Sequence, residues 1–458
     1  MSARRGKLGT LDGAALVVST VIGAGIFTVP SIIASLTGSG SGFITVWIAG
    51  GLLAIAGALS YAELASRFPD AGGEYVYLRE AFGPVAGFLS GWTSFIAGFS
   101  GAIAASAVGF ARYLAPIWPS VGGPPLARFG AGPLAVTISP ITLVAVGLVL
   151  VFTAVAVAGL ESSRRTNNAL ALVLVVGIVA FVTSGIVRLA GLPPVDPPTP
   201  VAAGGLMGIA AALVPVMFTY SGWNAATYVA NDFDAPRRTV PRALAIGAAV
   251  VTVLYVALNV TYLRALSVNG VAATPTPGEA ATGVILGVAR RNWLTPVVLA
   301  ALASSVCAMV ITGPRIYLQM ARDGAMPRAF AAVRPRDGFP VTSIVLQSSW
   351  SCVLVLTGTF DAIVTYTGFA VVLFAGAAVA SLFVVRRRDV EPWSGYRVWG
   401  FPVVPAVFVI ASALMLEATI AREPLPSLAG VALMAAGLPL YVWSKRRAGS
   451  DPESDSRV

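Results

Sequence analysis

The stretch Val21-Ile22-Gly23-Ala24-Gly25-Ile26-Phe27 lies in the middle of the first long apolar segment, residues 13–36. Two glycines around one alanine interrupt a segment that would otherwise cross a membrane as one helix. A break at that depth frees backbone N–H and C=O groups, and each one left without a partner costs several kcal/mol. Proteins tolerate such a break where the freed groups line an enclosed cavity or bind a ligand, as in secondary transporters. The stretch therefore predicts a substrate site inside a membrane protein.

The composition indicates a polytopic membrane protein. Of the 458 residues, 57% are hydrophobic and 11% charged, and the mean hydropathy is +0.83, which excludes a soluble globular protein. The net charge of +10 does not predict nucleic-acid binding, because the basic residues fall between apolar segments. The chain has no histidine, and its two cysteines, Cys307 and Cys352, lie in apolar segments. We therefore expect no metal site, no disulfide framework and no cofactor.

Twelve membrane-spanning helices are expected when about 20 apolar residues are required for each span. The predicted spans are approximately residues 13–36, 43–66, 85–115, 136–159, 168–190, 204–230, 243–266, 293–322, 341–357, 363–385, 402–421 and 427–444. Residues 1–449 would form one membrane domain, and the polar tail 450–458 is expected to be disordered. The outer loop 191–200 is Pro-rich and expected to be extended.

The distribution of basic residues predicts the orientation in the membrane. An even number of spans puts both termini on one side, and 23 of the 30 lysines and arginines fall on that side. The other seven are Arg112, Arg128, Arg188, Arg264, Arg290, Arg291 and Arg422. Because basic loops stay in the cytoplasm, we expect both termini to be cytoplasmic in a plasma (cell inner) membrane.

The sixth predicted span also contains a break, at Tyr220-Ser221-Gly222-Trp223-Asn224. This break lies five spans after the first, as an inverted five-plus-five repeat requires. Short amphipathic stretches at 73–83 and 278–287 follow spans 2 and 7, at equivalent places in the two halves. We therefore expect an all-α fold with two inverted repeats. The repeats would cover about residues 13–190 and 204–385, with spans 11 and 12 at 402–444 outside them.

The two ends of a broken helix can bind a zwitterion. One end presents free N–H groups and about half a positive charge, and the other presents free carbonyls. An α-carboxylate and an α-ammonium match that pair without charged side chains, which are costly in mid-membrane. Alternatively, Gly23 and Gly25 only permit close helix packing, as small residues commonly do. The second break favours the functional interpretation.

Several motifs resemble a known family. VIGAGIFTVP, residues 21–30, resembles the GxGIF signature of amino acid permeases of the amino acid–polyamine–organocation superfamily. FTYSGWNAATYVANDFDAPRRTVPRAL, residues 218–244, is similar to the same family, particularly its L-type and bacterial cationic or neutral amino acid branches. RIYLQMARDGAMP at 315–327 and SYAELASRFPDAGGEYVYLREAFG at 60–83 also fit. The likeness covers nearly the whole chain in order and implies a LeuT-like fold.

The resemblance implies a substrate site made of Val21, Gly23, Ala24, Gly25, Phe218, Ser221, Gly222 and Asn224. The amides around Ala24 and Gly25 would hold the substrate carboxylate. The carbonyls of Val21, Phe218 and Ser221 would hold the ammonium group. Phe218 would close over the substrate as a gate, unless it is an ordinary core aromatic. Asn224 would be a polar neighbour of the site, unless it only joins helices.

One residue that would be expected to couple transport to an ion gradient departs from the family pattern. Many proton-linked or sodium-independent relatives carry a lysine in span 5, whereas Leu174 occupies that position here. A sodium site spaced as in LeuT-type transporters would instead use Ser19, Ile22, Ala301, Ser304 and Ser305. Simple exchange and a proton route are the alternatives. For the proton route, Glu417 is the only carboxylate well inside a predicted span.

These features predict a secondary amino acid transporter, working as a symporter or an exchanger. A transporter-like sensor that binds amino acid without net flux is the alternative. A membrane enzyme would need paired carboxylates, a nucleophile–base pair or a metal cluster at one depth, and the sequence shows none. No acidic residue is evident at the predicted site, so we expect a neutral amino acid as the substrate and the lipid bilayer as the other partner.

Overall fold

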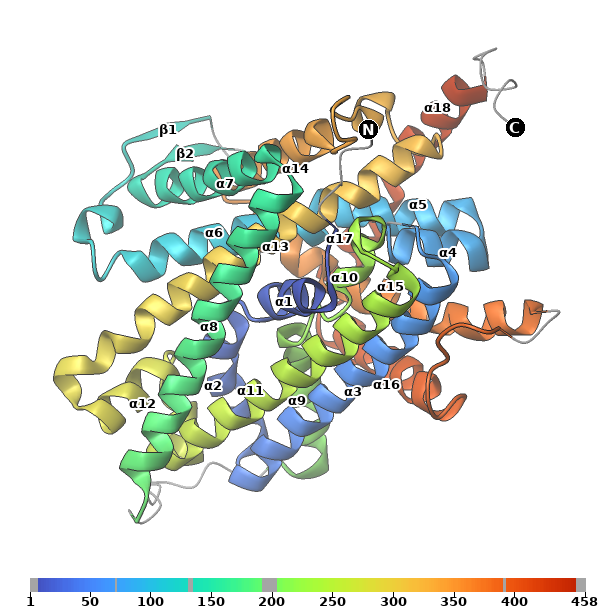
Figure 1. Ribbon diagram of the computed structural model, residues 1–458. Helices are drawn as coiled ribbons and strands as arrows, with labels where there is room; N and C mark the ends of the chain where they lie inside the picture. Colours follow the sequence, from blue (N-terminus) through green and yellow to red (C-terminus); the bar gives the residue numbers. More distant parts are fainter. Residues whose placement is uncertain (1–6, 71, 131–134, 192–203, 390–392, 450–458) are drawn as a thin grey trace.

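The computed structural model describes residues 7–70, 72–130, 135–191, 204–389 and 393–449. The predicted disorder of 450–458 lies outside the described residues, and so does the predicted extended loop beyond residue 191. Within the described residues the chain is almost entirely helical (Figure 1). One short antiparallel hairpin, β1 (Ala127–Phe129) with β2 (Val136–Ile138), joins two of the helices. The predicted all-α class is confirmed.

The helices follow the predicted order of spans. The first half contains α1 (Thr10–Val21), α2 (Gly25–Thr37), α3 (Gly40–Arg67), α4 (Glu74–Phe82), α5 (Pro84–Thr93), α6 (Phe99–Leu114), α7 (Pro140–Ala158) and α8 (Leu160–Leu189). The second half contains α9 (Gly205–Thr219), α10 (Ala225–Tyr228), α11 (Pro236–Ala272), α12 (Pro277–Leu286), α13 (Thr295–Arg322), α14 (Val341–Thr357) and α15 (Phe360–Arg388). The chain continues with α16 (Val403–Arg422), α17 (Pro424–Ala435) and α18 (Leu438–Gly449).

Each of the twelve predicted spans corresponds to a helix or to consecutive helices. Among the described residues, nine helical segments are long and apolar enough to cross a membrane, and α1 with α2 makes a tenth. The shorter apolar helices α9 and α14 take the places of spans 6 and 9. The fifth span begins at Leu160 rather than 168, because its first two turns are polar and a hydropathy scan does not detect them. The amphipathic helices α4 and α12 lie where the short stretches were expected.

Both predicted breaks are present. Helix α1 ends at Val21 and α2 begins at Gly25, and the two axes are bent by 52°. Helix α9 ends at Thr219, and α10 begins only at Ala225. The breaks lie five spans apart, as the inverted repeat requires, whereas the residue boundaries of the two repeats stay a prediction.

The broken helices lie in the interior of the bundle. Helix α1 packs against α8, α11 and α13, and α2 packs against α9 and α11 (Figure 1). Helix α13 is buried along most of its length. The freed backbone groups are thus enclosed by other helices, which is the condition under which a membrane protein tolerates them.

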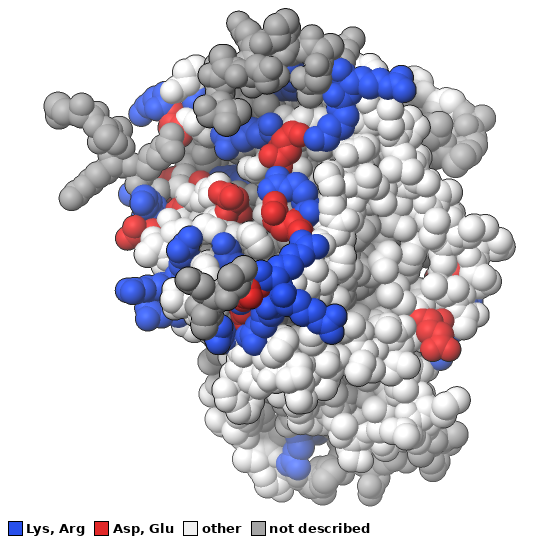
Figure 2. Space-filling model, turned by 90° about the vertical axis from the view of Figure 1, so that its right-hand side faces the viewer, with Lys and Arg blue, Asp and Glu red and all other residues white. Residues whose placement is uncertain are grey.

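Charged side chains gather on one side of the molecule, and most of the remaining surface in this view is uncharged (Figure 2). Ion pairs join several elements there: Lys7 with Asp234, Arg315 with Asp232, and Arg79 with Asp323. The Lys445 ammonium also donates to the backbone carbonyl of Asp323. The beginning and the end of the described chain therefore both lie beside the ends of spans 6 and 8.

A buried carboxylate holds part of this charged side together. Glu63, near the end of α3, is fully buried and accepts hydrogen bonds from Arg67 of the same helix and from Arg386 of α15. The amide of Val398 donates to its other oxygen at 2.8 Å. Arg67 in turn pairs with Asp389 at 2.8 Å. Glu63 therefore joins span 2 to the end of span 10 and to the segment before span 11.

We predict that Glu63→Gln lowers the stability of the folded protein by roughly 3 kcal/mol, because it leaves the nearly buried guanidinium group of Arg67 and the partly exposed one of Arg386 without their shared carboxylate. The measurement is the thermal unfolding of the purified protein in detergent. Glu161→Gln is the matched control, because Glu161 forms an exposed ion pair with Arg164, and the control should unfold close to wild type. Equal unfolding temperatures for the two variants would contradict the prediction.

Candidate functional site

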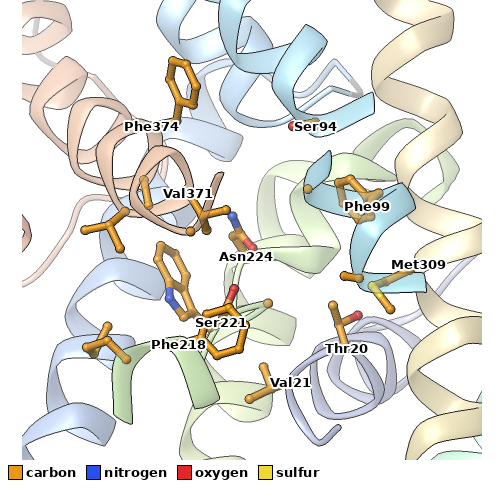
Figure 3. A pocket seen from close by; sticks show the side chains of 18 of the residues that line it. Thr20, Val21, Ser94, Phe99, Phe218, Ser221, Asn224, Met309, Val371 and Phe374 are labelled. Atoms are coloured by element: carbon orange, nitrogen blue, oxygen red, sulfur yellow. The ribbon is translucent and has the colours of Figure 1, made fainter. Parts of the chain in front are cut away.

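A cavity of about 320 Å³ lies between the two breaks. The residues that line it come from both breaks, from α5 and α6, from the start of α4, and from α13, α15 and α16. All eight residues of the predicted substrate site line this one cavity: Val21, Gly23, Ala24, Gly25, Phe218, Ser221, Gly222 and Asn224. Figure 3 shows Val21, Phe218, Ser221 and Asn224 around the same space, with Phe99 and Met309 farther across it. The fold thus brings together residues about 200 positions apart in the chain.

The first break is a tight turn followed by the start of a new helix. Ile22 leaves the helical conformation with φ −80° and ψ 88°, and the amide of Gly23 donates to the carbonyl of Val21 at 3.0 Å. Helix α2 then begins at Gly25. Amides in the first turn of a helix have no intrahelical acceptor, so Gly25 and Ile26 present donors at the positive end of α2. This end of the cavity can bind a carboxylate.

Two glycines allow the breaks to approach each other. A Cβ atom on Gly25 would lie 3.2 Å from the Thr219 side chain, and one on Gly222 would lie 2.7 Å from the Thr20 side chain. Gly222 also has φ +104°, which side-chain-bearing residues rarely adopt. A Cβ on Gly23, in contrast, would meet only Ser305 at 3.7 Å. Gly25 therefore serves close packing as well as the break, so the two sequence interpretations of these glycines are compatible.

A buried tyrosine joins the carbonyl ends of both broken helices. The Tyr255 hydroxyl of α11 lies 2.9 Å from the carbonyl oxygen of Val21, the last residue of α1. It lies 3.2 Å from the carbonyl oxygen of Thr219, the last residue of α9. Tyr255 was not among the predicted site residues. Its hydroxyl, a polar group in the middle of an apolar span, is the one feature of the sequence that could have indicated its role.

Hydrogen bonds within the protein engage two of the proposed ammonium acceptors. The Val21 carbonyl accepts from the Gly23 amide and from the Tyr255 hydroxyl, which uses both of its lone pairs. The carbonyl of Phe218 likewise accepts from two amides, those of Ser221 at 3.1 Å and of Tyr220. Of the three proposed acceptors, the carbonyl of Ser221 is therefore better placed for the ammonium group of a substrate than those of Val21 and Phe218.

Phe218 belongs to the cavity and not to the packed core. It stands in the last turn of α9, and 53% of its surface is exposed. Figure 3 shows its ring beside Ser221 at the edge of the open space. This exposure argues against the interpretation of Phe218 as an ordinary core aromatic and agrees with a residue that can move over a ligand.

An acidic residue lines the cavity, so the expectation of a lining without one is wrong. Glu74 is the first residue of α4, and its Oε1 atom accepts from the Tyr61 hydroxyl at 2.7 Å and from the Asn224 side-chain amide at 2.8 Å. Asn224 also donates to the Tyr228 hydroxyl at 2.8 Å. Glu74 escaped detection because the stretch that follows span 2 looks like a surface connection, and only the folded chain brings it beneath the span 6 break.

Burial raises the pKa of Glu74 above its ordinary value, because a charged carboxylate is poorly solvated there. Hydrogen bonds from Tyr61, Tyr228 and Asn224 act in the opposite direction but do not cancel the effect. Asn224 therefore has two roles that the sequence analysis treated as alternatives: it lines the cavity and it also joins α10 to α4.

Two of the predicted sodium ligands are in direct contact. The Ser304 hydroxyl of α13 donates to the Ser19 hydroxyl of α1 at 2.7 Å, and both side chains are fully buried. Ile22 and Ala301 are also buried, while Ser305 lines the cavity. The two hydroxyls are therefore hydrogen-bond partners of each other. Glu417, the candidate proton carrier in span 11, is exposed on α16 and is not among the residues that line the cavity.

The chain is similar in sequence to a known protein family and to several known proteins. The chain matches the family described as "Amino acid permease" over residues 8–442. It is 27% identical to the large neutral amino acids transporter small subunit 2 of Oryctolagus cuniculus, over 95% of this chain and 79% of that protein. It is 26% identical to the cystine/glutamate transporter of Homo sapiens, over 96% of this chain and 86% of that protein. It is 27% identical to the b(0,+)-type amino acid transporter 1 of Mus musculus, over 91% of this chain and 83% of that protein.

We predict that Gly25→Val abolishes substrate binding while the protein still inserts and folds. The added side chain would press on Thr219 and narrow the space in front of the α2 amides. The measurement is equilibrium binding to the purified protein after its fold has been checked. Gly147→Val in α7 is the matched control, because a Cβ there meets no atom within 4 Å. Wild-type affinity in folded Gly25→Val would remove the carboxylate site from the first break.

We predict that Phe218→Ala reduces the transport rate at least tenfold and changes the unfolding temperature little, because the ring is half-exposed. Phe43→Ala is the comparison, since Phe43 is fully buried in α3 and its truncation should cost roughly 3–5 kcal/mol of stability. Uptake into proteoliposomes and thermal unfolding are measured for both variants. A drop in unfolding temperature for Phe218→Ala as large as that for Phe43→Ala would assign Phe218 to packing.

Proposed function

Because this chain belongs to the amino acid permease family, we propose that its two breaks bind the two charged ends of one α-amino acid. The chain is a multi-pass membrane protein that transports amino acids, and the proposal concerns how and where it does so. The observation that carries it is that the freed backbone ends of spans 1 and 6 open into a single cavity. Its volume of about 320 Å³ is near the lower end for small-molecule sites and suits one small ligand.

The substrate carboxylate would lie on the amides that begin α2, at Gly25 and its neighbours. The ammonium group would lie on the opposite side, toward the carbonyl of Ser221. Phe218 would close over the bound molecule, and the breaks would move relative to the surrounding helices in each transport cycle. This is alternating access around a fixed site, in which backbone dipoles replace charged side chains.

We propose a neutral side chain for the substrate. Among the described residues that line the cavity there is no lysine or arginine, and Glu74 is the one charged residue. Burial raises the pKa of this carboxyl group, which disfavours a fixed negative charge in the cavity. The relatives differ by name in what they carry, from large neutral amino acids to cystine and glutamate, so the proposal for this chain rests on its own lining.

We also propose that the protein lies in the plasma membrane with both termini in the cytoplasm. The ion pair of Lys7 with Asp234 and the contact of Lys445 with Asp323 support termini on one side. The gathering of charged residues on that side supports its being the cytoplasmic one (Figure 2). The sensor alternative gains no support from the relatives, which are transporters by name.

The test of this function is uptake into proteoliposomes across a panel of labelled amino acids, together with counterflow against unlabelled amino acid inside. We expect saturable uptake of neutral L-amino acids, reduced at least tenfold by Gly25→Val and unchanged by Gly147→Val. Binding of the same amino acids to purified protein without any uptake or counterflow would favour the sensor and contradict the proposal.

We predict that transport does not require sodium, because the Ser19 and Ser304 hydroxyls bond directly to each other. Uptake is compared in sodium-containing and sodium-free proteoliposomes, for wild type and for a Ser304→Ala, Ser305→Ala double variant. We expect equal rates in both media and less than a threefold effect of the double variant. A strong loss of uptake without sodium, reproduced in sodium by the double variant, would instead establish the sodium site.

A further inference from the structure

We propose that Glu74 binds and releases a proton in each transport cycle and thereby couples amino acid uptake to a proton gradient. This inference rests on the proposed function, because it places the proton carrier in the same cavity as the amino acid. It names a residue that carries the coupled proton, which neither the family match nor the names of the relatives assign.

Glu74 stands at the junction of the cavity and the inner half of span 6. It lines the cavity from the first residue of α4. Its Oε1 atom accepts hydrogen bonds from Tyr61 of α3 and from Asn224, the residue just before α10. Within the described part of the chain, Glu74 forms no ion pair with a lysine or arginine. A proton on its second oxygen would make this cluster of hydrogen-bonded side chains neutral.

The groups around Glu74 are donors that keep their own protons. Tyr61 faces it from α3, Tyr228 from α10 and Tyr77 from α4 itself, and phenols ordinarily titrate near pH 10. Glu74 is the one carboxylic acid among these groups, and burial raises its pKa above the ordinary value.

Other carboxylates are less suited to this role. Glu63 is already shared by Arg67 and Arg386. Glu417 is exposed on α16, away from the cavity lining. Leu174 in span 5 is a buried apolar residue that cannot titrate. Glu74 combines a place in the cavity with the lack of an ion-pair partner among the described residues.

The contact with Asn224 links the charge of Glu74 to the position of the broken span. Asn224 lies three residues after Ser221, and its amide holds Oε1 while it also bonds Tyr228. With the proton bound, this buried contact is neutral and can persist. Loss of the proton leaves a charged carboxylate that burial disfavours, so the ionised form favours a state in which water reaches the cavity.

The step is a simple proton transfer. The O–H bond of the Glu74 carboxyl group breaks, its electron pair stays on the carboxylate, and the proton passes to water on the side to which the cavity has opened. A proton from the opposite side restores the acid after the cavity has changed its exposure. We place the amino acid in the cavity while Glu74 carries its proton, so the two are released on the same side and cross in the same direction.

The experiment uses proteoliposomes with an imposed pH gradient, a labelled neutral amino acid and a pH-sensitive dye inside. In wild type we expect an acidic exterior to drive accumulation of the amino acid together with acidification of the interior. Glu74→Gln, which imitates the protonated acid, should keep counterflow within about twofold of wild type. It should lose gradient-driven accumulation and reduce the coupled proton flux at least tenfold.

Glu279→Gln is the matched control. Glu279 follows a glycine near the start of α12, the helix of the second half that corresponds in chain position to α4, and it does not line the cavity. This variant should behave as wild type in all three measurements. Wild-type amino acid uptake without proton movement, or accumulation by Glu74→Gln under the gradient, would overturn the proposal. Loss of counterflow together with proton flux in folded Glu74→Gln would also overturn it, by assigning Glu74 to substrate binding.

A second variant keeps the proposal testable if Glu74→Gln does not fold. Tyr61→Phe removes a donor that stabilises the carboxylate but retains the ring contacts with Tyr77 and Trp223. The pKa of Glu74 should rise, so the pH at which uptake is half-maximal should move to a higher value, with counterflow at low pH unchanged. An unmoved pH profile would contradict the role of Glu74. Absence of counterflow in wild type would instead contradict the proposed transport function.

Discussion

A helix broken inside a membrane has to give its freed backbone groups new partners, and in this protein one hydroxyl group lies at the carbonyl ends of both broken helices. Tyr255 contacts the last carbonyls of both α1 and α9. Its single proton is shared between these two acceptors, so one side chain joins the two breaks at their carbonyl ends. The amides that begin α2 face the cavity instead and are free for a ligand. The position of the site follows from which freed groups the protein satisfies itself.

The rest of the fold maintains this arrangement. Helices α8, α11 and α13 enclose α1, and Gly25 and Gly222 permit the close approach of the two breaks. At the charged side, Glu63 joins span 2 to span 10 through Arg386, while α4 extends beneath span 6 and brings Glu74 to the cavity. The same helix that connects two spans thus supplies the titratable group. Binding of the amino acid and binding of the proton can then depend on one another through Asn224.

The sequence predicted what local backbone chemistry determines. Gly23 and Gly25, together with the second interruption around Gly222, indicated the breaks. Hydropathy locates each span to within a few residues, except where polar turns extend a helix, as at Leu160. Contacts between distant segments were not predictable in this way. Tyr255 contacts Val21, and Glu74 contacts Asn224, each across more than 100 positions of the chain. The Val21 carbonyl was predicted to bind the substrate ammonium group, because the sequence does not show that the Tyr255 hydroxyl contacts this carbonyl.

The central claim is that backbone groups of the two breaks bind both charged ends of one α-amino acid. Competition binding to the purified protein tests it most directly, with a transported neutral amino acid, its α-amide and its N-acetyl derivative as competitors. The amide removes the negative charge that the α2 amides would bind, and acetylation removes the positive charge that the carbonyls would bind. We expect each modification to weaken competition at least 100-fold. Either derivative competing as well as the parent amino acid would contradict the account.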